Sequence, residues 1–129
     1  MKAWENVLEM PVEGRSKKPR QIGYTMVLDK GLGIGATRDL VEMAADYVDT
    51  VKLTFGTSAF YDENVLIEKN KIITDAGIDV MPGGTFLEVA VWQNVYNRFL
   101  ERSKELGFTE IEVSDGTINI DLETRRELI

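Results

Sequence analysis

The segment Val51-Lys-Leu-Thr-Phe-Gly-Thr-Ser58 sets the pattern that the rest of the chain follows. It predicts a β-strand whose side chains alternate, with Val51 and Leu53 on one face and Lys52 and Thr54 on the other. The strand ends at a glycine that is followed by two hydroxyl residues. A lysine within an apolar, β-branched run indicates that one face of this strand meets a polar environment.

Strands and helices alternate four times along the chain, with strand centres near residues 26, 52, 80 and 111. A spacing of about 30 residues accommodates a strand, a crossover helix and two loops, which predicts a parallel sheet with right-handed crossovers. The glycines at 77 and 107 are expected to end helices, Asp121 to cap the last helix, and Thr37 or a neighbour to cap the first. The predicted strands are 24–29, 49–55, 78–81 and 109–113, and the predicted helices are 36–46, 63–75, 86–106 with an interruption near Trp92, and 122–129.

Two α/β architectures fit this order, an open doubly wound sheet and part of a TIM (β/α)8 barrel. Strands covered on both faces are continuous apolar runs. The second and fourth strands alternate instead, since Glu110 and Glu112 share a face just as Lys52 and Thr54 do. This alternation favours a barrel interior, and because a full barrel takes about 200 to 250 residues, four units make a half barrel.

The predicted organisation is an N-terminal arm at residues 1–21, followed by the first half of a (β/α)8 barrel at residues 22–129. The arm carries the apolar residues Trp4, Val7, Leu8 and Met10, which suit a short turn docked on the body. A basic, proline-interrupted connector follows at residues 15–20. Its composition favours a solvated linker over a lid that contacts anions.

Composition narrows the function classes. The chain has 129 residues and a formal net charge of −7, which argues against binding nucleic acid, because phosphate contacts need a basic face. It contains no cysteine or histidine, which excludes disulfides, thiolate or imidazole metal ligands and Ser-His-Asp catalysis. Any metal would need oxygen ligands, which suits Mg²⁺. No window approaches the about 18 apolar residues of a membrane span, so we expect a cytoplasmic protein without membrane association.

Polar residues that are unusual in a core follow the ends of the predicted strands. The carboxyl ends of parallel strands meet at one rim, so these residues are expected to converge on a single site. The set comprises Asp29 and Lys30, Lys52 with Thr57 and Ser58, Gly83, Gly84 and Thr85, and Glu112 with Ser114 and Asp115.

Each candidate at this rim has a functional and a structural interpretation. Lys52 suits a general acid or an anion clamp, and the alternative is a lysine that merely neutralises Glu112 or Asp29 across the interior. Asp29 and Glu112 suit oxygen ligands for Mg²⁺, and the alternative is ion pairs or loop caps.

The loops and aromatic residues divide in the same way. The loops at 83–85 and 56–58 suit anion binding through backbone N–H groups, and the alternative is ordinary tight turns. The aromatic residues Trp92, Tyr96 and Phe99 lie at helical spacing and are predicted to belong to a core or an interface.

In order and spacing, several motifs resemble those of the phosphosulfolactate synthase family from about Lys18 to the last residue. The motifs are Val27-Leu-Asp-Lys-Gly31, Asp46-Tyr-Val-Asp49 leading into Val51-Lys52, Phe55-Gly-Thr-Ser58, Pro82-Gly-Gly-Thr85 with Glu88, and Leu106-Gly-Phe108 leading into Ile111-Glu-Val-Ser-Asp-Gly116. The resemblance implies a TIM barrel that adds sulfite to phosphoenolpyruvate, with Mg²⁺, to give 2-phospho-3-sulfolactate for coenzyme M biosynthesis.

The resemblance also implies residue roles. Lys52 and Lys30 would be catalytic, through charge stabilisation or proton delivery, and Asp29 and Glu112 would hold the metal. The substrate would be bound by Thr57, Ser58, Gly84, Thr85 and Ser114.

The sequence covers about half of the family pattern. Three arrangements would explain this: a fragment, a second chain that supplies the other half, or a homo-oligomer in which two copies close a barrel. An alternative function is a non-catalytic, anion-binding or stress-related barrel of the same family.

Overall fold

A three-stranded parallel sheet lies at the centre of the computed structural model, which describes residues 3–9, 14 and 16–129. The strand order is β1 (Met26–Asp29), β2 (Thr50–Leu53) and β3 (Asp79–Met81). Val51 lies opposite Val27 on one side and Val80 on the other. The mixed α/β class and the parallel sheet are therefore confirmed, whereas closure into a barrel stays a prediction, as do the domain limits.

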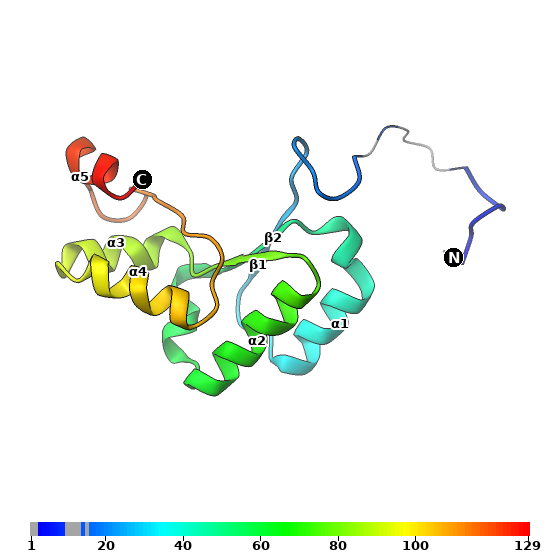
Figure 1. Ribbon diagram of the computed structural model, residues 1–129, viewed down its shortest axis with the longest axis horizontal. Helices are drawn as coiled ribbons and strands as arrows, with labels where there is room; N and C mark the ends of the chain where they lie inside the picture. The colour runs from blue at the N-terminus through cyan, green and yellow to red at the C-terminus, as the bar shows by residue number, and fades with distance from the viewer. Residues whose placement is uncertain (1–2, 10–13, 15) are drawn as a thin grey trace.

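Helices cover one face of this sheet and one end of it (Figure 1). The pair α1 and α2 packs together on one side, and α3 and α4 form a second pair beside the carboxyl ends of the strands. The helices are α1 (Ile34–Ala44), α2 (Glu63–Asp75), α3 (Gly84–Trp92), α4 (Tyr96–Glu105) and α5 (Leu122–Glu127), with 3₁₀ turns at Ala45–Tyr47 and Thr54–Phe60. No helix in the described residues has the length and apolar character needed to cross a bilayer.

The two faces of the sheet differ, as the alternation in β2 predicted. Val51 and Leu53 are fully buried in the core under α1 and α2, with Leu66, Ile73, Ile78, Val80 and Phe108. On the opposite face, Lys52 is only half-buried, and β1 exposes Met26 and Leu28 to 46% and 50%. One face therefore forms the apolar core, and the other is open and partly polar.

The fourth predicted strand, residues 109–113, is not formed as a strand. The segment does run beside β3, because the N–H groups of Thr109 and Glu110 both donate to the Val80 carbonyl, at 3.0 and 3.1 Å. The Val80 N–H donates to the Thr109 side-chain hydroxyl, at 2.9 Å, and not to a backbone carbonyl. A side chain thus takes the place of one rung, and the regular ladder is interrupted.

The expected helix ends are largely confirmed. Gly77 and Gly107 have φ angles of +68° and +84°, and each donates its N–H back into the preceding helix. Asp121 caps α5 by accepting from the Thr124 N–H at 2.8 Å. The single helix expected at 86–106 is interrupted where predicted, after Trp92, and resumes at Tyr96. Thr37 is wrong as a cap, because it lies buried inside α1 and its hydroxyl donates to the Gly33 carbonyl.

The N-terminal arm is fixed to the body at Arg20. Its guanidinium is 2.7 Å from the Asp49 carboxylate, and both side chains are buried. Asp49 also accepts from the Thr25 N–H at 2.8 Å. Trp4, Val7 and Leu8 are about two-thirds exposed, so the docked turn is not formed by these described residues. Met10 and Arg15 lie outside the described residues.

Candidate active site

Lys52 and Glu112 form the centre of the candidate site. The Lys52 Nζ lies 2.7 Å from Glu112 Oε1, and the side chains are 20% and 31% exposed. Two positions earlier on each segment, the Thr50 hydroxyl donates to Glu110 over the same distance. These two pairs place the polar side chains of β2 and of residues 110–112 on one face of the sheet. Thr50 lies at the amino end of β2, and Lys52 lies nearer its carboxyl end.

The amino terminus of α3 holds the second carboxylate oxygen of Glu112. The Gly84 N–H donates to Glu112 Oε2 at 2.6 Å. A Cβ added at Gly84 would lie 2.7 Å from the Ser114 Cβ and 2.9 Å from that oxygen, which is closer than real contacts allow. Glycine at this position is therefore what lets α3 approach the 112–114 segment.

Glu88, one turn further along α3, binds the loop that follows. It is fully buried, and its carboxylate accepts from the Ser114 hydroxyl and from the N–H groups of Gly116, Thr117 and Ile118. An ionised carboxylate can only accept hydrogen bonds, so the Ser114 hydroxyl is the donor in its hydrogen bond to Glu88. The remaining capacity of that hydroxyl is as an acceptor.

Asp29, at the end of β1, is paired with a buried lysine. The Lys69 Nζ lies 2.6 Å from Asp29 Oδ2, and both side chains are only 1% exposed. Asp29 Oδ1 accepts from the N–H groups of Gly31 and Leu32, both at 2.8 Å, and Lys69 also donates to the Leu32 carbonyl. This network shapes the loop that carries Lys30, which is exposed immediately after the strand.

The loop after β2 carries the remaining candidates. Phe55 and Gly56 have φ angles of +55° and +70°, which turn the chain away from the strand. The hydroxyls of Thr57 and Ser58 are buried, and Ser58 lines a small cavity of about 180 Å³ with Phe86 and Phe99. Ser58 therefore lies under α3 and α4, whereas Thr85, in the first turn of α3, is half-buried.

Tyr61 adjoins the Asp29 network. Its ring centroid is 5.4 Å from the Lys69 Nζ. Burial and the nearby charge of Asp29 raise the pKa of Tyr61, so the phenol keeps its proton. Tyr61 is half-buried, and its hydroxyl is buried without a hydrogen-bond partner; the sequence did not single out this residue.

The expected Mg²⁺ ligands do not come together in this arrangement. Glu112 is shared between Lys52 and Gly84, and Asp29 between Lys69 and two backbone N–H groups. Within the part of the chain that the structure describes, no group of three acidic side chains is placed to hold a metal ion. The residues present therefore do not fit Mg²⁺ as they stand, and we assign it no step.

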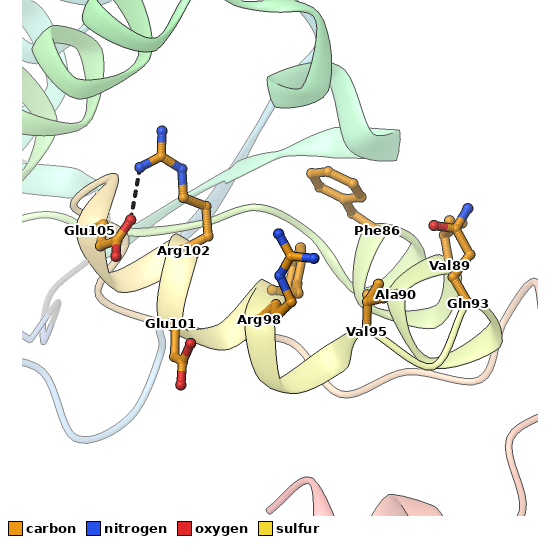
Figure 2. A pocket seen from close by; sticks show the side chains of 10 residues that line it. Phe86, Val89, Ala90, Gln93, Val95, Arg98, Glu101, Arg102 and Glu105 are labelled. Carbon is orange, nitrogen blue, oxygen red and sulfur yellow. Dashed lines mark hydrogen bonds and ion pairs between the residues drawn. The ribbon is translucent and has the colours of Figure 1, made fainter.

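A separate groove lies between α3 and α4 on the outside of the molecule (Figure 2). It has a volume of about 550 Å³ and is lined by Phe86, Val89, Ala90, Gln93, Val95, Arg98, Phe99, Glu101, Arg102 and Glu105. Neither Lys52 nor Glu112 borders it. Phe99 is half-buried and packs edge to face on Phe86. Trp92 is 71% exposed, so it is wrong as a core residue, and its role in an interface stays a prediction.

Comparison with known proteins decides the family. A family model described as (2R)-phospho-3-sulfolactate synthase (ComA) matches residues 13–129. The chain belongs to this family. The motif resemblance is thus confirmed, and so is the assignment to a family of enzymes, the phosphosulfolactate synthases, which are lyases.

Three curated relatives, each named phosphosulfolactate synthase, align with most of this chain. The relative from Methanothermobacter thermautotrophicus is 36% identical over 124 residues, 96% of this chain and 48% of its own length. The relatives from Methanocaldococcus jannaschii and Bacillus subtilis are 43% and 35% identical, over 84% and 86% of this chain and 43% and 42% of their own lengths. The chain spans about half the length of these phosphosulfolactate synthases and matches their N-terminal half.

Sequence reasoning missed the roles of Lys69 and Glu88. Both carried a signal, because each is a charged residue on the apolar side of its helix. Lys69 falls between Leu66 and Ile73 in the buried stripe of α2, and Glu88 follows Leu87 in that of α3. A charge at such a position needs a buried partner.

Proposed function

We propose that this chain supplies the lysine-bearing part of an active site that joins sulfite to phosphoenolpyruvate. The observation that carries the proposal is the Lys52–Glu112 pair, held by Gly84 at the strand ends. Family membership supports the reaction class, and the names of the relatives, phosphosulfolactate synthases, support the product.

The reaction needs one cation close to the forming charge. Sulfite attacks the methylene carbon through sulfur and forms the carbon–sulfur bond. The π electrons of the carbon–carbon double bond move onto the substrate carboxylate, and protonation at C2 completes 2-phospho-3-sulfolactate. The Lys52 ammonium suits either stabilisation of the charge or delivery of this proton, and the contact with Glu112 at 2.7 Å orients it.

The anionic groups of the substrate need donors at the same rim. The first turn of α3 presents backbone N–H groups that have no partner within the helix. Gly84 already uses its N–H on Glu112, so Thr85 is the next donor. In the proposal, Thr57, Ser58 and Ser114 line the site and Lys30 provides a second cation. Mg²⁺, with Asp29 and Glu112, remains part of the proposal and requires rearrangement of both carboxylates.

The open face of the sheet supports a further part of the proposal. Tyr24, Met26 and Leu28 are 66%, 46% and 50% exposed on or beside β1. We propose that these strands form half of a (β/α)8 barrel and that a second half, or a second copy of the chain, covers this face. A cytoplasmic location and a place in coenzyme M biosynthesis belong to the same proposal.

The decisive experiment is an assay of sulfite-dependent phosphoenolpyruvate consumption. The chain is tested alone and after mixing with a separately produced C-terminal half of the Methanocaldococcus jannaschii relative, with the Lys52→Ala variant in parallel. Turnover that needs sulfite and Lys52 is the expected result. Equal turnover by Lys52→Ala would sink the assignment. Binding of phosphoenolpyruvate without turnover in either sample would favour the non-catalytic alternative, which the ion pair between Lys52 and Glu112 also favours.

A further inference from the structure

Glu88 is an uncommon carboxylate, because it is fully buried and its bonds go to a single loop. Oε1 accepts from the Ser114 hydroxyl and from the Gly116 N–H at 3.0 Å. Oε2 accepts from the N–H groups of Thr117 and Ile118 at 2.8 and 2.6 Å. In the described part of the chain no lysine or arginine pairs with Glu88. Backbone and hydroxyl dipoles therefore stabilise its charge.

This bonding is sufficient to keep the group ionised. Burial, the strongest single influence, would raise the pKa of Glu88, but the hydrogen bonds from Ser114 and the three backbone N–H groups together lower it. A buried carboxylate with four donors therefore fixes the path of the loop at residues 114–118. Glutamine, the neutral isostere, would not hold the loop in this way, because its amide NH₂ group is a donor and would face the N–H donors of the loop.

The loop begins two residues after Glu112, and α3 forms hydrogen bonds both to Glu112 and to the start of the loop. Gly84 bonds to Glu112, and Glu88, four residues later on the helix, bonds to Ser114. The Ser114 side chain also lies directly against Gly84, where an added Cβ would be 2.7 Å from the Ser114 Cβ. The first turn of α3 and the 112–114 segment are therefore in close contact and are joined by two hydrogen bonds.

We propose that Glu88 is a positioning residue that fixes the 114–118 loop against α3 and so presents Glu112 to Lys52. This deepens the proposed function, and its consequence for catalysis rests on that function. The positioning itself does not, since it concerns contacts within this chain. The proposal also gives Ser114 a role, because its hydroxyl is the donor that links the loop to Glu88.

The test uses backbone amide NMR and hydrogen exchange on the full chain. In Glu88→Gln, the amides of Gly116, Thr117 and Ile118 should exchange at least about tenfold faster, and so should the Gly84 amide, with loss of its downfield shift. Glu101→Gln, on the exposed face of α4, is the matched control and should change none of these. The Ile73 amide in α2 reports global stability and should stay protected.

The exchange rate and chemical shift of the Gly84 amide show whether Glu88 positions Glu112 or only stabilises its own loop. If the loop amides lose protection while Gly84 keeps its shift and exchange rate, the proposal is overturned. If Glu88→Gln does not fold, Ser114→Ala, which removes one donor of four, must speed Gly84 exchange at least about threefold, and no change would also overturn it. These readouts need no substrate. Absence of sulfite-dependent turnover both in the chain alone and in its mixture with the C-terminal half would therefore end the proposed function and leave this inference standing.

Discussion

Lys52 donates to Glu112 across sixty positions of sequence, at 2.7 Å and on the open face of the sheet. Both side chains keep some contact with solvent, at 20% and 31% exposure. Partly solvated pairs contribute about 1 kcal/mol or less to stability, because salt and water screen them. The pair is therefore better understood as a way of orienting a cation than as a way of stabilising the fold.

Under the proposed function, Lys52 contacts phosphoenolpyruvate, so Lys52→Met should weaken binding of this substrate with little effect on stability. A charge-assisted hydrogen bond contributes about 1.5 to 3 kcal/mol, so the dissociation constant should rise by roughly ten- to a hundredfold. Isothermal titration calorimetry measures this, with Lys104→Met on exposed α4 as the control. An unchanged affinity in Lys52→Met would remove Lys52 from the site.

Gly84→Ala should separate α3 from the 112–114 segment. The new methyl group would overlap the Ser114 side chain and approach Glu112 Oε2 to 2.9 Å, and such overpacking costs about 1 to 3 kcal/mol. Gly35→Ala in α1 is the matched control, because nothing lies within 4 Å of its added Cβ, and a helical alanine should stabilise by about 0.5 to 1 kcal/mol. Urea unfolding compares the two. Equal effects would mean that the close approach at Gly84 is not required.

The parts of this site that the sequence could predict depend on local periodicity. The alternation through Val51 and Lys52 predicts an apolar face and a polar face that carries the lysine, and it leaves both Glu112 and Asp29 as candidate partners. Periodicity could not predict the buried charge partners, because a charged residue at a core position does not reveal which segment will neutralise it. Lys69 meets Asp29 across 40 positions and Glu88 meets a loop about 28 positions away. Periodicity could not predict the interrupted fourth strand either. There the Val80 N–H donates to the Thr109 hydroxyl, whereas a regular strand would offer a backbone carbonyl.

Lys69→Met should destabilise the protein strongly. It leaves the buried Asp29 carboxylate without its cation, and breaking a buried pair in this way costs about 3 to 5 kcal/mol. Lys71→Met, two residues away and exposed, should change the free energy of unfolding by less than about 0.5 kcal/mol. The double variant Asp29→Asn/Lys69→Met should recover part of the loss, because no unpaired charge remains. A cost below about 1 kcal/mol for Lys69→Met would show that water reaches Asp29.

Asp49 should make the stability of the chain depend on pH in the acid range. Burial alone would raise the pKa of Asp49, but the Thr25 N–H and the Arg20 guanidinium lower it below its ordinary value of 3.8. Because the unfolded chain then binds the proton more readily, the contribution of Asp49 is complete above about pH 3.8 and is lost as the pH falls through the lower, folded pKa.

Asp49→Asn isolates this contribution from those of the other carboxylates. The difference in unfolding free energy between the variant and the unmodified chain should be constant from pH 7 to pH 5. It should be smaller at pH 2.5, because this pH lies below the ordinary pKa of 3.8, so the unfolded chain binds a proton at Asp49 there. Urea unfolding at these three values measures it, and Asp39→Asn on the exposed face of α1 should show no such trend. If this difference in unfolding free energy is the same at pH 7 and pH 2.5, the negative charge of Asp49 does not contribute to the attachment of the arm through Arg20.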